Sequence, residues 1–462
     1  MFKPKFSTKQ VLRVIVVGCG KVGATLVERL SREGHDITII DKDADKVDEL
    51  TDAFDIMGVV GNGASYNTQK EAGIEEADLI IAVTESDELN LLCCTIATQV
   101  GDCSAIARIR TPDYSNEAGY IRDKLGLSLI INLDMEAAKE IANILYLPTA
   151  LEVNSFAHGQ ADMIKFKVTD NNLLCNQTVA SISQMSSSSI LICAIERKEE
   201  IYIPSGDFKI LSGDIIYFVS PRRGAKTFLG DIGFKTNQVS NALIVGGSNT
   251  AFYLAKMLLT MGINVKIIEK DMHRCEELST LLPKAVIIND DGTNPEVLTE
   301  AGLEYAEAFI PLTGMDEENI LLNLHARHVS KAKVVTKLDH INFKEVISSL
   351  DLGSVLYPRY ITSEAIIAYV RAKKNSMNSN IETLYHIFDS RAEAIEFSVT
   401  QKSEVTNIPL KDLSLKDNLL ISFINRNGKI LIPSGMDCIE VGDTVMIVTT
   451  HTGFDNIKDI LK

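Results

Sequence analysis

The sequence predicts an α/β protein of two tandem units, each a doubly wound parallel sheet followed by a small α+β module. Three observations lead to this prediction. Short runs of Val, Ile and Leu alternate with amphipathic helical patterns, which is typical of a parallel sheet covered on both faces. After Pro148 this alternation gives way to strands and turns. The whole pattern then occurs a second time.

The repeat is visible as similar segments at a nearly constant separation of 228 or 229 positions. The matching pairs are 18–23 with 246–251, Asp41 with Glu269, 84–90 with 313–319, 203–206 with 432–435, and 213–214 with 442–443. Such a constant offset indicates a tandem duplication of a unit of roughly 220 residues.

The elements of the first unit follow from this periodicity. Strands of the parallel sheet are expected at 11–17, 37–40, 56–60, 79–83, 105–109 and 129–131, with helices at 22–31, 44–53 and 88–99. A connecting helix is expected at 135–145, and strands of the small module at 161–168, 190–195, 201–203 and 215–219.

The second unit is expected to repeat this plan, with a helical connector at 363–374. The expected domains are a leader at 1–10 with no assigned role, doubly wound domains at 11–135 and 240–358, and small modules at 148–230 and 381–462.

Composition excludes several classes of protein. Acidic residues outnumber basic ones by 62 to 46, so the formal charge of −16 disfavours general nucleic-acid binding. Nowhere do 18 consecutive apolar residues occur, so no membrane span is expected. The 8 cysteines form no Cys-x-x-Cys pair, which is typical of reduced core residues in a cytosolic protein.

The first glycine-rich segment has the features of a dinucleotide-binding loop in a Rossmann-like domain. The loop consists of Gly18, Cys19, Gly20, Lys21, Val22 and Gly23. It follows a strand, opens a helix, and precedes an acidic residue, Asp41, at the end of the next strand. Gly18 permits a tight turn, Gly20 lets the backbone approach a pyrophosphate, and Gly23 permits close helix packing. The alternative is that these glycines serve packing alone.

The same context predicts which groups contact the ligand. The helix N-terminus attracts phosphate, and Lys21 is a further candidate phosphate contact. Asp41 would accept hydrogen bonds from ribose hydroxyls and repel a 2′-phosphate, which favours NAD(H) over NADP(H).

Further candidates lie at the expected carboxyl ends of the other strands, where ligands bind in open parallel sheets. They are Asn62 and Gly63 after the third strand, Val83 and Thr84 after the fourth, and Arg108 at the end of the fifth. Arg108 would face a phosphate or form a structural pair with a carboxylate, and both alternatives stay open.

The second glycine-rich segment has lost parts of the pattern. It consists of Gly246, Gly247, Ser248, Asn249 and Thr250, followed by Ala251. Ser248 replaces the second glycine, Ala251 the third, and Asn249 the lysine, so a Cβ crowds a dinucleotide and a cation is lost. Glu269 keeps an acidic group at the ribose position. Either this site binds a nucleotide differently, through the hydroxyls of Ser248 and Thr250, or it is only scaffold.

Other chemical groups give weaker signals. His325 and His328 share a helix face, but no third metal ligand is near them in sequence. The adjacent Cys93 and Cys94 lie in an apolar run and are expected to be buried. The serine run 186–189 has no feature of a nucleophile.

Several motifs together resemble the regulator of potassium conductance (RCK, or KTN) family. They are 16–23, Asp41, 61–65, 72–78 and 82–90. The small modules, with Ile-Pro-Ser-Gly and Gly-Asp, resemble the C-terminal companion domain of the TrkA-C type. Two copies of each in this order are similar to the regulatory subunits of bacterial potassium uptake systems.

The resemblance implies a cytoplasmic, peripheral protein that binds NAD(H), with ATP or ADP as further ligands. It implies a homo-oligomeric ring, a tetramer, that gates a potassium-translocating membrane subunit of the TrkH or TrkG type at the inner face of the membrane. The family's nucleotide contacts fall on 18–22, Asp41, Val83, Thr84 and Arg108, and in the second half on 246–250 and Glu269. Lys337 stands in the place of Arg108 there.

An NAD-dependent dehydrogenase is the alternative hypothesis. Hydride transfer needs a general acid or base beside the nicotinamide. The histidines of the small modules, His158, His386 and His451, have no paired carboxylate that can be identified from the sequence. A nucleotide-sensing regulator is therefore expected, and not an enzyme.

Overall fold

The computed structural model describes residues 11–462 except 102, 171, 183, 184, 222, 223, 235, 340–346, 348, 349, 351, 375–380, 389 and 390. The expected leader, 1–10, lies outside the described residues. The chain divides into two units, Met1–Asp134 with Arg359–Ser379, and Met135–Pro358 with Asn380–Lys462.

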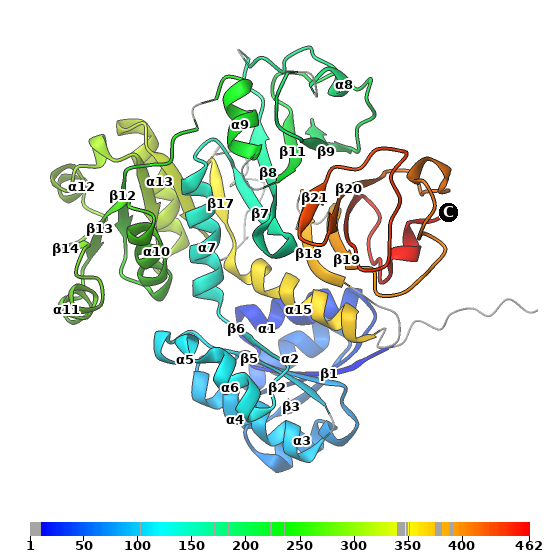
Figure 1. Ribbon diagram of the computed structural model, residues 1–462. Coiled ribbons are helices and arrows are strands. Elements are labelled where there is room, and N and C mark those ends of the chain that lie inside the picture. The colour runs from blue at the N-terminus through cyan, green and yellow to red at the C-terminus, as the bar shows by residue number, and fades with distance from the viewer. Residues whose placement is uncertain are drawn as a thin grey trace, which may run out of the picture. The chain divides into compact units, whose positions relative to one another are not determined.

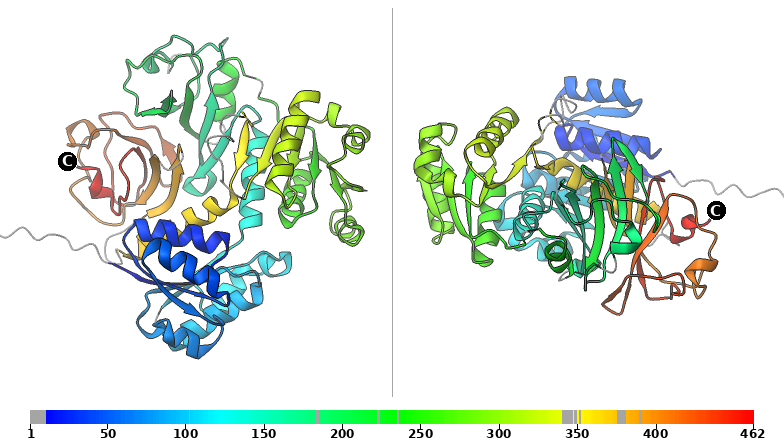
Figure 2. Two further views of the ribbon diagram at one scale, coloured as in Figure 1. Left: turned by 180° about the vertical axis from the view of Figure 1, so that it is seen from behind. Right: turned by 90° about the horizontal axis from the view of Figure 1, so that it is seen from above.

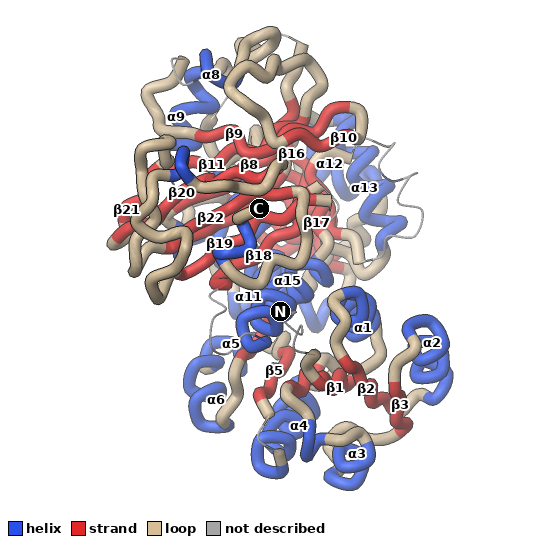
Figure 3. The backbone as a smooth tube through the Cα atoms, turned by 90° about the vertical axis from the view of Figure 1, so that its right-hand side faces the viewer, coloured by secondary structure: helices blue, strands red, loops and turns tan. Residues whose placement is uncertain are grey.

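The first unit contains a parallel sheet of six strands in the order β3-β2-β1-β4-β5-β6. Helices α1 and α2 cover one face, and α3 and α4 cover the other (Figures 1 and 3). The elements are β1 (Arg13–Val17), α1 (Lys21–Arg32), β2 (Asp36–Asp41), α2 (Ala44–Phe54), β3 (Met57–Val60), α3 (Tyr66–Glu71), η1 (Ile74–Glu76), β4 (Leu79–Ala82), α4 (Asp87–Val100), β5 (Ser104–Arg108), α5 (Pro112–Asn116), α6 (Ala118–Leu125) and β6 (Leu129–Ile131). This is the predicted doubly wound fold, whose strand order reverses between β1 and β4.

Cysteines of α4 belong to the core beneath this sheet. Cys93 and Cys94 are fully buried and pack with Ile15 and Val17 of β1. Burial raises the pKa of the Cys93 thiol to about 12, and it also raises the pKa of Cys94. Both thiols are therefore neutral core groups, as expected.

A helix from far along the chain packs on α1. This helix is α15 (Pro358–Lys374), the predicted connector. Helix α15, drawn in yellow, lies beside the blue α1 (Figure 2). Its Arg371 donates from Nε to Oε1 of Glu33 at 2.8 Å, and the Arg29 guanidinium lies 4.7 Å from the ring centre of Tyr360. The connector that follows the second doubly wound domain thus belongs to the first unit.

The second unit contains a parallel sheet in the order β14-β13-β12-β15-β16-β17. Its elements are β12 (Asn241–Val245), α10 (Asn249–Thr260), β13 (Asn264–Glu269), α11 (Met272–Leu281), β14 (Val286–Asn289), α12 (Pro295–Ala301), η3 (Leu303–Tyr305), β15 (Ala308–Pro311), α13 (Asp316–Val329), β16 (Lys333–Lys337) and β17 (Ser354–Leu356). The strand order is that of the first sheet, as the duplication predicts.

Two antiparallel sheets form the small modules, in the orders β10-β9-β11-β8-β7 and β18-β19-β22-β20-β21. The first follows α7 (Leu133–Tyr146) and comprises β7 (Glu152–Phe156), η2 (Ala157–Gly159), β8 (Ala161–Lys167), α8 (Val179–Ile182), β9 (Leu191–Arg197), β10 (Glu200–Tyr202), β11 (Ile215–Pro221) and α9 (Gly224–Asp231). The second comprises β18 (Ile381–Ile387), β19 (Ala392–Ser398), η4 (Leu410–Asp412), β20 (Leu419–Arg426), β21 (Lys429–Leu431), β22 (Thr444–Thr449) and η5 (Ile457–Ile460). Strand β7 is present in the structure but was not among the strands expected from the sequence.

The repeated Gly-Asp motif holds a buried ion pair in each module. Arg197 donates from Nε and Nη2 to the two carboxylate oxygens of Asp214, at 2.8 and 2.7 Å. Arg426 makes the same two bonds to Asp443, both at 2.8 Å. Because both aspartates are only 1% exposed, these bidentate pairs supply the partners that their buried charges need.

The two small modules share one core within the second unit. Phe156 and Tyr217 of the first module pack with Phe388 and Phe423 of the second. Oε1 of the buried Glu396 accepts a hydrogen bond from the backbone N–H of Ala157 at 2.9 Å, across this interface. No helix in the described part of the chain has the length and apolarity needed to cross a lipid bilayer.

Candidate functional site

The first glycine loop leaves the N-terminus of α1 open. Helix α1 begins at Lys21, one residue before the expected start, and its N-cap residue Gly20 provides no side-chain hydrogen bond. A Cβ built on Gly20 would meet no atom within 4 Å. Backbone N–H groups at this position can therefore be approached closely by an anion, which a helix N-terminus attracts.

The other two glycines of the loop are needed for close backbone packing. Gly18 has a φ of +102°, and a Cβ there would lie 3.0 Å from the backbone nitrogen of Thr84. A Cβ on Gly23 would lie 1.9 Å from the carbonyl oxygen of Gly18. The loop is thus folded tightly against the end of β4, while Gly20 between them faces open space.

Asp41 accepts two backbone hydrogen bonds, one of them from the glycine loop. Its Oδ2 accepts from the N–H of Cys19 at 2.6 Å, and its Oδ1 accepts from the N–H of Asp43 at 3.0 Å. Each carboxylate oxygen has further lone-pair capacity for a ligand hydroxyl. Burial and the nearby Asp41 charge raise the pKa of the Cys19 thiol to about 12, so it stays neutral.

Arg108 is a buried cation at the end of β5. It is 8% exposed, its Nε has no hydrogen-bond partner, and no ion pair joins it to a described carboxylate. Burial lowers the pKa of its guanidinium and the neighbouring Arg110 charge lowers it further, while the charges of Asp134, Asp87 and Glu85 raise it. An unpaired buried charge is costly, so an anionic ligand would relieve it.

The remaining predicted residues lie at the ends of β3 and β4. Asn62 is exposed, and its Oδ1 accepts from the N–H of Ala64 at 3.1 Å. Gly63 is buried, and a Cβ there would lie 2.2 Å from a methyl carbon of Val17. Val83 is buried against the glycine loop.

The corresponding edge of the second sheet holds a pocket of about 460 Å³. Its lining residues are Val245, Gly246, Gly247, Ser248, Ile268, Glu269, Lys270, Asp291, Gly292, Thr293, Leu312, Thr313, Gly314, Met315 and Glu318. Thr250 is fully buried and is not among them. The volume is in the range of small-molecule sites.

In the second glycine loop, side chains of the protein already accept hydrogen bonds from the backbone N–H groups. The Ser248 hydroxyl caps α10 by accepting from the N–H of Ala251 at 3.3 Å. Oε2 of Glu269 accepts from the N–H of Gly247 at 2.5 Å, in the way that Asp41 accepts from Cys19. The N-terminus of α10 therefore already has an acceptor, in contrast to that of α1.

Arg274 restores a cation to the second loop, which sequence reasoning missed. It donates from Nε to the carbonyl of Gly247 at 2.6 Å and from Nη2 to Oδ1 of Asn249 at 3.2 Å. Its Nη1 pairs with Glu277 at 2.6 Å. The position lies on α11, outside the glycine motif, so the motif itself contained no signal for it.

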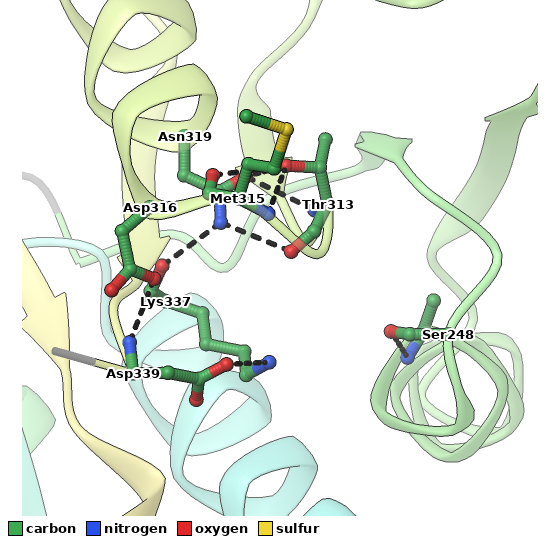
Figure 4. A network of polar contacts seen from close by, with 8 residues as sticks. Ser248, Thr313, Met315, Asp316, Asn319, Lys337 and Asp339 are labelled. Atoms are coloured by element: carbon green, nitrogen blue, oxygen red, sulfur yellow. Dashed lines mark hydrogen bonds and ion pairs between the residues drawn. The ribbon is translucent and has the colours of Figure 1, made fainter.

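The second site also differs at the end of its fifth strand. Lys337, the counterpart of Arg108, pairs with Asp339 at 3.0 Å (Figure 4). Asn319 accepts from the N–H of Thr313 at 3.0 Å and donates to the carbonyl of Lys337 at 3.1 Å. The first site thus has a buried cation that forms no close ion pair with a described carboxylate, where the second has a lysine in an ion pair.

One expectation about the small modules is wrong. His386 does have a carboxylate neighbour, because its Nε2 lies 3.5 Å from Oε1 of Glu393. The two residues are directly opposite on β18 and β19, a register that the sequence alone does not reveal. The pair lies in an antiparallel module sheet and not at the carboxyl edge of a parallel sheet.

The weaker candidates form no metal site or catalytic group among the described residues. His325 and His328 lie on α13, and no group of three or more metal-ligating side chains occurs among the described residues. The Ser186 hydroxyl donates to Asp231 at 2.7 Å.

Together, the two parallel sheets, the glycine loops at their strand ends and the antiparallel modules define a duplicated protein of the Rossmann-like class. The family model described as TrkA-N domain matches residues 14–133 and 242–358, and that described as TrkA-C domain matches 163–232 and 394–462. The chain therefore belongs to the TrkA family, which confirms the resemblance and the fold expected from the motifs.

Curated relatives match over nearly the whole chain. A protein of Methanosarcina mazei named Trk system potassium uptake protein TrkA homolog 1 is 27% identical over 98% of this chain and 100% of its own length. The Trk system potassium uptake protein TrkA of Halomonas elongata is 29% identical over 94% of this chain and 95% of its own. These names are those of transport proteins, in agreement with the expectation of a regulator and not an enzyme.

Solved structures share the fold. The structure titled GsuK channel bound to NAD has a TM-score of 0.62 at 15% identity, over 96% of this chain and 77% of that chain. The GsuK RCK domain has a TM-score of 0.63 at 15% identity, over 96% of this chain and 93% of that one.

Proposed function

We propose that this protein is a nucleotide-sensing regulatory subunit of a potassium uptake system. Its relatives are named as potassium uptake proteins, and it matches them over nearly the whole of both chains. A nicotinamide dinucleotide at the first glycine loop biases the conformation of the protein. A potassium-translocating membrane subunit of the TrkH or TrkG type responds to that conformation.

The observation that carries this proposal is the open, cationic edge of the first sheet. Gly20 leaves room for a pyrophosphate at the uncapped N-terminus of α1, and Lys21 is exposed beside it. Arg108 adds a buried cation whose Nε has no hydrogen-bond partner. The residues present therefore fit the diphosphate of NAD(H), ATP or ADP.

The remaining contacts favour NAD(H). Asp41 is held with its carboxylate at the loop, where it would accept hydrogen bonds from ribose hydroxyls and repel a 2′-phosphate. Asn62 and Val83 border the place for the adenosine. The bound dinucleotide supplies no redox step here, because its occupancy alone is the signal.

Ligand binding can shift a conformational equilibrium only by its difference in affinity for the two states. Such coupling is typically about 1–3 kcal/mol per site. A homo-oligomeric ring, with a tetramer as the proposed form, would sum this coupling over identical sites.

The second site is proposed as a site for an adenine nucleotide bound in a different manner. Its pocket of about 460 Å³ supports a ligand there, while the capped helix and the Lys337–Asp339 pair argue against the first site's diphosphate contacts. Glu269 and Ser248 line it and supply hydrogen-bonding groups.

Isothermal titration of the full chain with NADH, NAD, NADPH, ATP and ADP tests the ligand. We expect NADH or NAD to bind more tightly than NADPH, and their failure to bind contradicts the proposal. Potassium flux into vesicles that hold the membrane partner then tests regulation, which should depend on the nucleotide only when this protein is present.

The dehydrogenase alternative is tested separately. Incubation with NAD and a panel of hydroxy acids should give no steady NADH production. Turnover that is lost in a His386→Ala variant would favour the enzyme instead, since the ring of this small-module histidine lies 3.5 Å from a carboxylate oxygen.

A further inference from the structure

The side-chain amide of Asn90 ties together two strands whose ends form the proposed nucleotide site. Asn90 is fully buried on α4. Its Oδ1 accepts hydrogen bonds from the backbone N–H of Thr84 at 2.8 Å and from the Thr84 hydroxyl at 2.7 Å. Its Nδ2 donates to the carbonyls of Thr84 at 3.2 Å and Arg108 at 2.9 Å. One side chain therefore joins the carboxyl end of β4 to that of β5.

The strand end that Asn90 holds is also the support of the glycine loop. A Cβ on Gly18 would lie 3.0 Å from the backbone nitrogen and 3.1 Å from the Cα of Thr84. The two backbones are thus in direct contact, and a displacement of Thr84 would displace Gly18. Through Thr84 and the Arg108 carbonyl, Asn90 reaches both the loop and the buried cation, although it is not itself exposed to a ligand.

The second half repeats this arrangement around a different site. Asn319 accepts from the N–H of Thr313 at 3.0 Å and from its hydroxyl at 2.9 Å (Figure 4). It donates to the carbonyls of Thr313 at 3.2 Å and Lys337 at 3.1 Å. Asn319 is therefore the equivalent buried amide in the second half, where Ser248 caps the helix and Lys337 is paired with Asp339. A substitution of Asn319 can thus serve as the control for the same substitution of Asn90.

We propose that Asn90 is a positioning residue of the first nucleotide site, one that sets the relative positions of the glycine loop and Arg108. This inference rests on the proposed function. Groups that hold contact residues in place, without touching the ligand, govern affinity because small displacements weaken the bonds they align.

The test replaces Asn90 by Asp in the full chain. An ionised carboxylate can still accept from Thr84, but it cannot donate, and it faces the carbonyl oxygens of Thr84 and Arg108. We expect NADH affinity to fall about tenfold at alkaline pH. At acidic pH the loss should shrink relative to the unsubstituted chain, because a protonated carboxyl again donates a hydrogen bond.

The matched control is Asn319→Asp, which makes the same change in the second half. We expect it to lower the unfolding temperature to a similar extent but to leave NADH affinity at the first site unchanged. Equal losses of NADH affinity in both variants, or normal affinity in Asn90→Asp, would overturn the inference.

A second pair of variants and the unsubstituted chain complete the test. If Asn90→Asp does not fold, Asn90→Ser and Asn319→Ser are compared by the same criterion, since serine retains a smaller donor and acceptor. If the unsubstituted chain does not bind NADH, the proposed function fails and this inference fails with it.

Discussion

The carboxylate of Asp41 accepts a hydrogen bond from the backbone N–H of Cys19 at 2.6 Å, inside the glycine loop. The acidic residue expected to bind a ribose therefore also shapes the loop expected to bind the phosphates. Glu269 and Gly247 repeat the relationship in the second half at 2.5 Å. In both halves one side chain joins two parts of the site, so its replacement should alter ligand binding and loop geometry together.

Replacing Asp41 by Asn removes the charge and one of its two hydrogen-bond acceptors. The amide oxygen can still accept from Cys19, but the amide NH2 cannot accept from Asp43, and the negative charge that repels a 2′-phosphate is lost. We expect NADH affinity to fall about tenfold and the preference for NADH over NADPH to narrow. Calorimetric titration with both dinucleotides measures this, and Glu269→Gln is the matched control. An unchanged NADH to NADPH ratio in Asp41→Asn would refute the assigned role.

Replacing Arg108 by Met tests the buried cation. Because its Nε has no partner and burial lowers its pKa, the charge opposes folding in the absence of ligand. We expect Arg108→Met to unfold at the same temperature or higher, yet to bind NADH more weakly and with less dependence on salt. Lys337→Met, which removes a paired cation, should leave NADH binding at the first site unchanged. A destabilised Arg108→Met with normal affinity would show a structural role instead.

The interface between the small modules should depend on pH through Glu396. Burial raises the pKa of this carboxyl from 4.5 to about 7, while the Thr383 hydroxyl, the Ala157 N–H and His158 lower it and the Glu382 charge raises it. Between pH 4.5 and about 7, Glu396 is protonated in the folded state and ionised in the unfolded state. The free energy of unfolding therefore falls as the pH rises through this range, by about 3 kcal/mol at most.

Glu396→Gln imitates the protonated carboxyl and should remove most of this dependence. We expect it to raise the unfolding temperature at about pH 8 and to have little effect at about pH 5. Thermal unfolding at several pH values measures the difference, with Glu382→Gln, an exposed neighbour, as the control. Equal pH dependence in Glu396→Gln and the unsubstituted chain would contradict this reading.

Much of the fold could be predicted because its signals are local and repeated. The glycine loops, the alternation of strands and helices and the constant offset all follow from short-range patterns. Strand β7 was not predicted because Glu152, Asn154 and Ser155 interrupt its apolar pattern. The packing of α15 on α1 was not predicted because Arg371 and Glu33 are far apart in sequence and meet only in the tertiary fold.

The sequence predicted where the site lies, but not the residues that hold the site residues in place. Asn90 belongs to a segment that recurs in both halves, and that recurrence was its only sequence signal. Arg274 lies on a helix outside the glycine motif, and the pairing of His386 with Glu393 depends on strand register. Contacts of this kind require three-dimensional knowledge, because neither spacing nor residue type specifies them.

We propose that a dinucleotide binds against the backbone at Gly20. A Cβ at this position meets no atom within 4 Å and its φ is −71°, so Gly20→Val should fold normally while its side chain blocks the pyrophosphate. Gly314→Val, at an equally open position lining the second pocket, is the control.

Calorimetric titration of NADH into these two variants and the unsubstituted chain is the most direct measurement. We expect Gly20→Val to lose NADH binding at the first site, whereas Gly314→Val should retain it. Normal NADH binding by a correctly folded Gly20→Val protein would show that the dinucleotide does not bind at this loop.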